Sequence, residues 1–258
     1  FKQHEKVRAC MTLRNPVDNF RRFDEAFKPD PTKKYYVHAD LAQKHDKCAV
    51  AIAHVEKWVN IQVINNYEQV APIVVVDAVA WWEPKIEGPV NLSEVKQWIQ
   101  NLRRIGFDIG MVSFDRWQSF DIQNELKQVG MRTDTVSVAK KHYEDLAMMI
   151  YEERIAMPQI DLLLQELSEL KIMKGNRVDH PRKSSKDLAD AVCGAIFGAI
   201  SHTPKDTNLE VEIHTFRELQ RDNYLEEMEK QQKENNVVRP PRKMPADLAD
   251  ALEGMGII

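Results

Sequence analysis

The stretch YYVHADLAQKHDKCAVAIAHVEKW, residues 35–58, decides the fold, because it holds two β-rich runs with a polar turn, QKHDK, between them. A third run, IVVVDAVAWW, follows at residues 73–82, and the intervening VNIQVINNY either extends the second strand or adds another. Runs rich in Val, Ile and aromatic residues, joined by short polar segments, are typical of strands paired in a meander. We therefore predict that the first three strands pair antiparallel.

Helices and strands alternate through the rest of the chain to residue 201. Apolar residues recur at helical spacing in LSEVKQWIQNLRRI, residues 92–105, and a short apolar run, DIGMVSFD, reads as a buried strand that ends at Asp115. The remaining predicted elements are a helix over 119–130 that ends at Gly130, a fifth strand in MRTDTVSV, helices over 142–154 and 159–170, and a closing helix, DLADAVCGAIFGAI. This order predicts an α/β fold whose mixed central sheet, antiparallel first and then parallel, is flanked by helices.

We divide the chain into three parts. Residues 1–33 are polar, are broken by three prolines, and read as a lead-in or linker outside the sheet; residues 34–201 form the α/β domain; residues 202–258 form an acidic, partly flexible C-terminal extension. The extension holds 8 Lys/Arg and 12 Asp/Glu, which accounts for the net charge of −4. Net charge therefore does not identify a binding partner.

Several functional classes are excluded by what the sequence lacks. No apolar run approaches the roughly 20 residues of a membrane span, and the charged start is not a signal peptide. There is no GxGxxG or GxxxxGK[ST] phosphate loop, so P-loop ATP hydrolysis is not expected. The three cysteines form no zinc pattern, and we interpret them as reduced, buried thiols in a cytosolic compartment. A chain that begins at Phe1 suggests a fragment of a longer protein.

Four aspartates lie where a mixed sheet exposes side chains. Asp40 is near the end of the first strand, Asp115 ends the fourth, and Asp187 and Asp190 open the closing helix. Acids three residues apart share one helix face, and in the first turn they lie at the positive end of the helix dipole. We expect these carboxylates to meet. Each also has a structural alternative, because Asp is common at strand ends, in turns and at helix N-caps.

A cluster of this kind predicts a metal site. Carboxylates so close together cannot all stay ionised unless cations neutralise them. Oxygen ligands suit Mg²⁺ or Mn²⁺ rather than zinc. Two such ions, roughly 4 Å apart, activate a water and stabilise the leaving 3′ oxygen of a phosphodiester. The residues therefore point to two-metal hydrolysis of nucleic acid.

Three motifs in this order resemble the C-terminal nuclease domain of the large terminases of tailed phages and other viruses. They are DLAQKHDKCAVAIA after the first strand, SFDRWQS after the fourth, and KDLADAVCGAIFGAI on the last helix. The resemblance covers about residues 34–201 and implies the RNase H-like fold, which terminases share with Holliday-junction resolvases and transposases. It matches Asp40 to the first-strand metal ligand, Asp115 to the fourth-strand acid, and Asp187 and Asp190 to the helix acids. Which of the last two bridges both metals stays open.

The resemblance also implies a function. It implies an endonuclease that cleaves double-stranded viral DNA during genome packaging, with two Mg²⁺ or Mn²⁺ ions, in the cytoplasm of the infected host cell. It further implies an ATPase motor domain upstream in the full protein. Two alternatives stay open: a resolvase or transposase-like nuclease with the same chemistry, and a non-catalytic nucleic-acid-binding module whose acids are structural.

Six basic residues between the last two helices predict contacts to DNA phosphates; they are Lys171, Lys174, Arg177, Arg182, Lys183 and Lys186. The segment KIMKGNRVD reads as a hairpin that turns at Gly175–Asn176 beside the acids, with a solvated loop as the alternative. A second DLADA, residues 247–251, follows a linker and lacks companion strands. We interpret it as a docking helix for a packaging partner, with the portal and the small terminase subunit as the candidates.

Two further features are expected to be structural. Trp81, Trp82 and Trp98 are predicted in the core rather than in a base-stacking surface. Asp77 lies within the third strand, where it is an edge polar residue or a structural partner, and we do not assign it to the metals.

Overall fold

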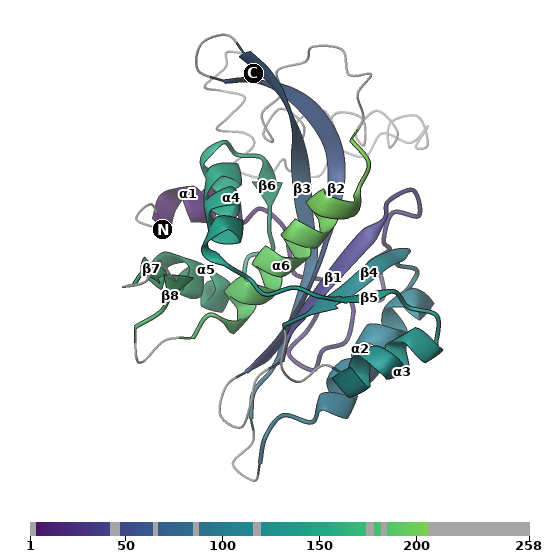
Figure 1. The fold of residues 1–258 in the computed structure, drawn as a ribbon. Coiled ribbons are helices and arrows are strands. Elements are labelled where there is room, and N and C mark those ends of the chain that lie inside the picture. Colours follow the sequence, from purple (N-terminus) through teal and green to yellow (C-terminus); the bar gives the residue numbers. More distant parts are fainter. Residues whose placement is uncertain are drawn as a thin grey trace, which may run out of the picture.

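A six-stranded mixed sheet forms the centre of the molecule. The computed structural model describes residues 4–205 except 42–46, 64–66, 85–87, 116–119, 174–177 and 182–184. The strands lie in the order β5-β4-β1-β2-β3-β6 (Figure 1). They are β1 (Tyr35–Asp40), β2 (Cys48–Val63), β3 (Tyr67–Trp82), β4 (Ile109–Phe114), β5 (Thr133–Thr135) and β6 (Ile155–Ala156). The pairs β1/β2 and β2/β3 are antiparallel, and β1/β4, β4/β5 and β3/β6 are parallel, so the predicted order of pairing is confirmed.

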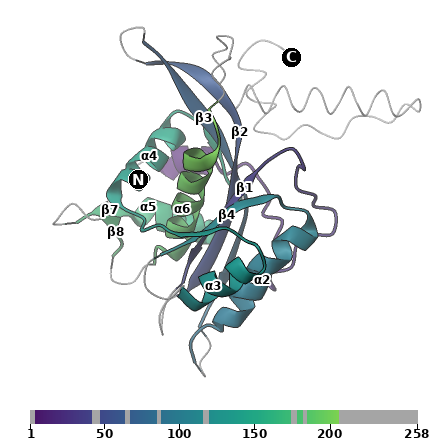
Figure 2. The same cartoon turned by 45° about the vertical axis from the view of Figure 1, so that its right-hand side comes forward.

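Helices cover both faces of this sheet (Figures 1 and 2). One face carries α1 (His4–Ala9), α4 (Lys140–Tyr151), α5 (Asp161–Glu169) and α6 (Asp187–His202), and the other carries α2 (Leu92–Ile105) and α3 (Phe120–Gln128). Alternation along β1 separates the two cores, because Tyr36 packs with α6 whereas Tyr35 and Val37 pack with α2. The closing helix α6 is apolar around most of its circumference and is accordingly buried against the sheet.

The predicted elements match the structure closely, with three informative differences. The helix over 92–105 is α2, capped by Gly106 at φ 115°. VNIQV, residues 59–63, extends the second strand, and the third strand begins at Tyr67 rather than at residue 73. The helix expected over 142–154 was set too late at both ends, because α4 spans 140–151. Glu153 then takes φ 56°, and the chain turns into β6. This edge strand was not predicted, since two residues carry no periodic signal.

The described part of the lead-in, residues 4–33, contributes no strand to the six-stranded sheet and packs on the core. Val7, Cys10 and Met11 are buried among residues of α4, α5 and α6. The Asn15 side chain donates from Nδ2 to the Val79 carbonyl at 2.9 Å and accepts from the Val79 N–H at 3.1 Å. It thereby satisfies backbone groups of β3 beyond the short β6. The described part of this segment is therefore held against the domain by apolar packing and hydrogen bonds.

Some predicted features lie outside the described residues. These are most of the turn QKHDK, the RWQS part of the fourth-strand motif, the hairpin turn at Gly175–Asn176, and the extension from residue 206 onward. The flanks of the hairpin are described, and β7 (Lys171–Ile172) pairs antiparallel with β8 (Val178–Asp179). Of the helices in the described part of the chain, none has the length and apolar character needed to cross a membrane.

Candidate active site

Asp40 and Asp115 lie side by side at the carboxyl ends of two adjacent parallel strands. The register pairs Ala39 of β1 with Phe114 of β4; Asp40 is the last residue of β1, and Asp115 directly follows β4. Alternation places Asp40 on the same face as Tyr36, and Asp115 on the same face as Met111. Both Tyr36 and Met111 belong to the core beneath α6. The two acids therefore lie on the face of the sheet that α6 covers.

The start of α6 brings the other two acids to this place. Asp187 Oδ2 accepts a hydrogen bond from the Lys47 N–H at 3.3 Å, at the point where the chain enters β2. Asp190, one turn later, is 8% exposed. Its two oxygens are both engaged: Tyr143 of α4 donates its hydroxyl to Oδ1, and the Lys186 ammonium donates to Oδ2. The four predicted aspartates thus lie close enough for Asp115, Asp187 and Asp190 to act on Asp40 through their charges.

The electrostatics of Asp40 reflect this gathering. Burial is the largest cause that raises the pKa of Asp40 well above its ordinary value, and the charges of Asp190 and Asp187 raise it further. Lys186 acts in the opposite direction, and Asp115 adds to the rise. Burial likewise raises the pKa of Asp190, against the lowering effect of Lys186. A cation at this place would relieve both carboxylates.

The donor set fits a hard divalent cation, but the side chains are not arranged to hold one as they stand. Among the described residues, no group of three or more His, Cys, Asp or Glu side chains is positioned to hold a metal ion. All four candidate ligands are carboxylates, which Mg²⁺ and Mn²⁺ prefer. Lys186 occupies Oδ2 of Asp190. Metal binding would therefore require the ammonium to leave that oxygen.

Glu166 of α5 fixes the start of α6, and sequence reasoning missed it. Its side chain is 1% exposed; Oε2 accepts from the Ala189 N–H at 3.0 Å and Oε1 from the Ser185 hydroxyl at 2.5 Å. The N-cap residue Lys186 makes no capping hydrogen bond through its side chain. Glu166 thus caps α6 from another helix, and its burial raises its pKa. The available signal was a Glu on the apolar face of α5, three residues after Leu163.

The predicted DNA-contacting residues fall into three groups. Lys186 joins the acids through Asp190. Lys171 is exposed on β7. Lys174, Arg177, Arg182 and Lys183 lie outside the described residues.

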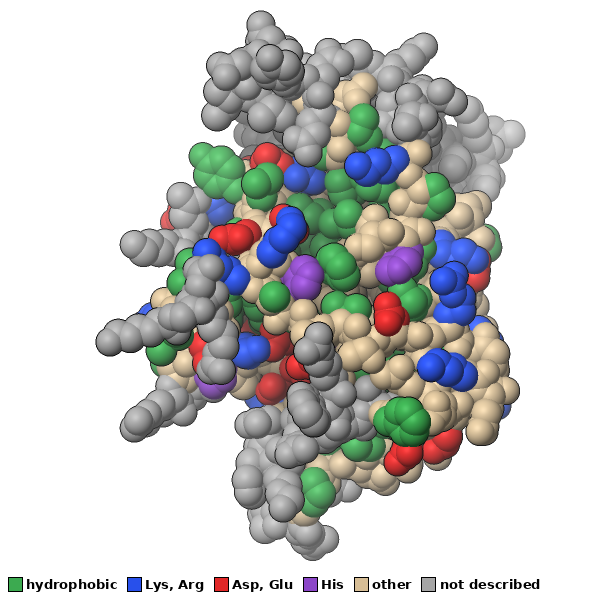
Figure 3. Space-filling model, in the orientation of Figure 1, with side chains coloured by type: hydrophobic (Ala, Val, Ile, Leu, Met, Phe, Trp, Pro, Cys, Tyr) green, Lys and Arg blue, Asp and Glu red, His purple; other side chains and the backbone are tan. Residues whose placement is uncertain are grey.

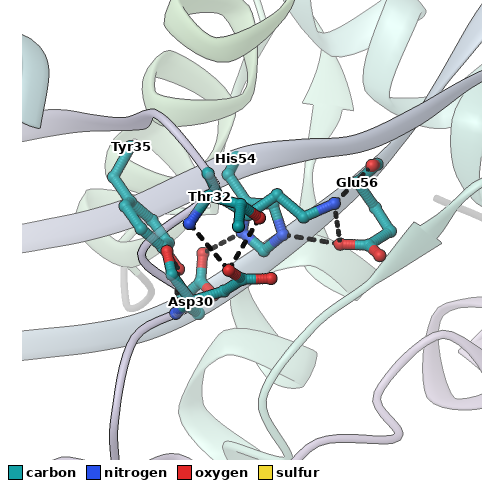
Figure 4. A network of polar contacts seen from close by, with 7 residues as sticks. Asp30, Thr32, Tyr35, His54 and Glu56 are labelled. Atoms are coloured by element: carbon teal, nitrogen blue, oxygen red, sulfur yellow. Dashed lines mark hydrogen bonds and ion pairs between the residues drawn. The ribbon is translucent and has the colours of Figure 1, made fainter. Parts of the chain in front are cut away.

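A polar network around His54 and Glu56 lies at the other end of β1 (Figure 4), and Asp77 belongs to it. His54 lies between two carboxylates, with Nδ1 2.8 Å from Asp77 Oδ2 and Nε2 2.9 Å from Glu56 Oε2. Lys33 Nζ lies 3.0 Å from the same Glu56 oxygen. The hydrogen bonds and charges of Asp77 and Glu56 outweigh burial and raise the pKa of His54 to about 9. Asp77 is therefore a structural partner, as one of the two expected alternatives had it, and Trp82 and Trp98 are buried core residues.

The surface beside α6 also carries an apolar hollow of about 310 Å³. Figure 3 shows apolar side chains there, with Lys and His side chains next to them. The hollow lies between α4, α6 and the β2–β3 ribbon, and its lining includes Trp58, Met149, Ile196 and Lys205. The four aspartates do not line it. The hollow and the acids are therefore separate features of this face.

Comparison with solved structures identifies the fold. The chain is similar to the large terminase nuclease of thermophilic phage G20c, with a TM-score of 0.54 at 13% identity over 79% of this chain and 99% of that one. The nuclease domain of the Thermus phage P74-26 large terminase gives a TM-score of 0.52 at 12% identity, over 83% and 100%. The HK97 bacteriophage large terminase gives 0.50 at 13% identity, over 78% of this chain and 43% of that one.

The sequence alone finds no such relatives, because no protein-family model and no curated protein matches the chain. Identities of 12–13% show the fold and no more. The resemblance drawn from the three motifs is confirmed at that level: the chain has the RNase H-like fold of phage large terminase nuclease domains.

Proposed function

We propose that the chain is a metal-dependent endonuclease that cleaves double-stranded viral DNA during genome packaging, as the nuclease part of a large terminase. The observation that carries this proposal is the meeting of Asp40, Asp115, Asp187 and Asp190 around the end of β1, with Lys186 as a resident cation. The terminase nuclease fold supports it, and the G20c nuclease has been solved with bound magnesium.

Each residue of the site takes a defined role in this proposal. The four carboxylates would hold two Mg²⁺ or Mn²⁺ ions, which when bound activate a water and stabilise the leaving 3′ oxygen. Lys186, once released from Asp190, is free to face a DNA phosphate. Glu166 holds the first turn of α6, and so fixes the direction of both helix acids. Lys171 and the basic residues of the hairpin region contact the phosphate backbone without reading bases.

The proposal includes the setting in which this chemistry works. An ATPase motor domain precedes the nuclease in the full protein and drives the DNA that this site cuts. The protein acts in the cytoplasm of the infected host cell. The C-terminal extension, with its second DLADA, contacts the portal or the small terminase subunit.

The test uses plasmid DNA with Mn²⁺ and three variants. Asp40→Asn and Asp115→Asn should each abolish nicking while leaving the fold intact, because each removes one charged ligand from the site. Asp121→Asn, an acid at the start of α3, is the matched control and should cut like the wild type. Normal nicking by either site variant contradicts the proposal.

Two further assays separate the alternatives. A wild-type preference for four-way junctions over linear duplex would favour a resolvase. Absence of Mn²⁺ binding, with DNA binding retained, would favour a non-catalytic module in which Lys186 permanently neutralises Asp190.

A further inference from the structure

One face of α6 meets one face of β1 residue by residue. Asp190, Gly194 and Gly198 are spaced by four and therefore share a helix face. Asp40, His38 and Tyr36 alternate along β1 and share the face beneath it. Gly198 lies over Tyr36 and Gly194 over His38, so that the next step along both elements brings Asp190 to Asp40.

The contact at Gly194 is much tighter than ordinary packing. A Cβ built on Gly194 would lie 2.3 Å from Cγ of His38 and 2.6 Å from its Nδ1. Nothing at this position except glycine lets α6 approach the strand so closely. A side chain there would require a separation of about 1 Å more to reach the 3.4 Å at which van der Waals contact becomes ordinary.

His38 cannot easily move out of the way. It is fully buried, and its Nδ1 lies 2.8 Å from the Ser113 hydroxyl of β4. That hydroxyl donates to the Val37 carbonyl at 3.2 Å, so the imidazole Nδ1–H must donate to Ser113 Oγ. His38 therefore connects β1, β4 and α6, the three elements that carry the four acids.

We propose that Gly194 and His38 are positioning residues that set the depth of α6 on the sheet, and with it the spacing of Asp187 and Asp190 from Asp40 and Asp115. This inference rests on the proposed nuclease function. A helix lifted by about 1 Å carries its two acids away from the strand acids. Displacements of that size at a reacting centre cost on the order of a hundredfold in rate.

The same helix supplies a matched control. At Gly198 an added Cβ would meet Cβ of Tyr36 at 3.4 Å, which is ordinary contact. Gly194→Ala and Gly198→Ala gain the same intrinsic helix propensity. They differ in the clash with His38 alone, so a difference between them reports on the depth of α6.

The experiment measures Mn²⁺ affinity, plasmid nicking and thermal unfolding in EDTA for both variants. Gly194→Ala should lose on the order of a hundredfold in kcat and about tenfold or more in Mn²⁺ affinity, with KM for DNA little changed. Gly198→Ala should stay within about twofold of the wild type in each. The double variant His38→Ala/Gly194→Ala restores space beneath the helix and should bind Mn²⁺ as tightly as His38→Ala alone.

The outcomes separate this inference from the proposed function. A Gly194→Ala protein that folds and matches the wild type in Mn²⁺ affinity and kcat overturns the inference alone. Should Gly194→Ala not fold, an Mn²⁺ affinity of the double variant more than about tenfold below that of His38→Ala overturns it instead. A wild-type protein that neither binds Mn²⁺ nor nicks DNA overturns the proposed function itself.

Discussion

Two groups of charged side chains lie at opposite ends of β1, and they differ in their balance of charge. In the His54 network, which comprises His54, Asp77, Glu56 and Lys33, two cations face two carboxylates at hydrogen-bonding or ion-pair distance. In the acidic site, the charges of three aspartates act on Asp40, and Lys186 contacts Asp190. The first group is balanced within itself. The second carries an excess of negative charge.

This difference separates structure from function. A balanced network of buried charges needs nothing further, and removal of one partner leaves a buried charge uncompensated. A site with excess like charge is unfavourable in isolation and becomes favourable when a cation arrives. Asp77 and Asp40 are both strand aspartates whose pKa values are raised by burial. Asp77 lies beside the cation His54 and has a structural role, whereas Asp40 lies near further carboxylates and is a candidate metal ligand.

The largest effect on stability is expected from a substitution that removes one charge from the His54 network. Asp77→Asn should lower the free energy of unfolding by about 3 kcal/mol, because protonated His54 loses a buried counter-charge. Urea denaturation in EDTA measures this loss, and nicking below the unfolding transition should be retained. A change under about 0.5 kcal/mol, the range of an ordinary surface substitution, would contradict the balanced-charge interpretation.

A second effect follows from the pKa of His54, which is raised from 6.5 to about 9. Its stabilising contribution is fully present below pH 6.5 and is lost as the pH rises toward 9, by roughly 2–3 kcal/mol at most. Glu56, with its pKa lowered to about 2, stays ionised throughout this window. Denaturation midpoints between pH 6 and 9.5 should fall in the wild type. In His54→Gln the midpoints should change little with pH. An equal fall in the two proteins would contradict the raised pKa of His54.

The smallest effect has the opposite sign and sharpens the contrast. Asp40→Asn should raise the free energy of unfolding in EDTA by about 1 kcal/mol, because it removes one of the crowded carboxylates while keeping the shape of the side chain. With Mn²⁺ added, the wild type should gain more stability than the variant. If Asp40→Asn destabilises the metal-free protein as strongly as Asp77→Asn does, the two groups of charges do not differ as described.

The sequence carried enough to place the four acids. Alternation along β1 and β4 decides which face each residue occupies, so Asp40 and Asp115 follow from apolar periodicity once the strands are identified. Spacing of three places Asp187 and Asp190 on one face of α6. Both inferences use spacing within one element. The pairing of β1 with β4, and the packing of α6 on them, then bring the two pairs of acids to the same end of the sheet.

What the sequence did not reveal depends on contacts between distant residues. Glu166 caps α6 from another helix, and Tyr143 reaches Asp190 from α4. Neither interaction has a fixed spacing in the chain. The close approach of Gly194 to His38 likewise depends on the distance between α6 and β1, which no sequence periodicity encodes. Lys186 was assigned to DNA phosphates from composition, and the structure pairs it with Asp190.

The most direct test of the acidic site is an anomalous-scattering map of a crystal soaked in Mn²⁺. We expect two peaks roughly 4 Å apart, bounded by Asp40, Asp115 and the acids of α6, with the Lys186 ammonium moved away from Asp190. A map without peaks at this place, with Lys186 still bound to Asp190 Oδ2, would contradict this expectation.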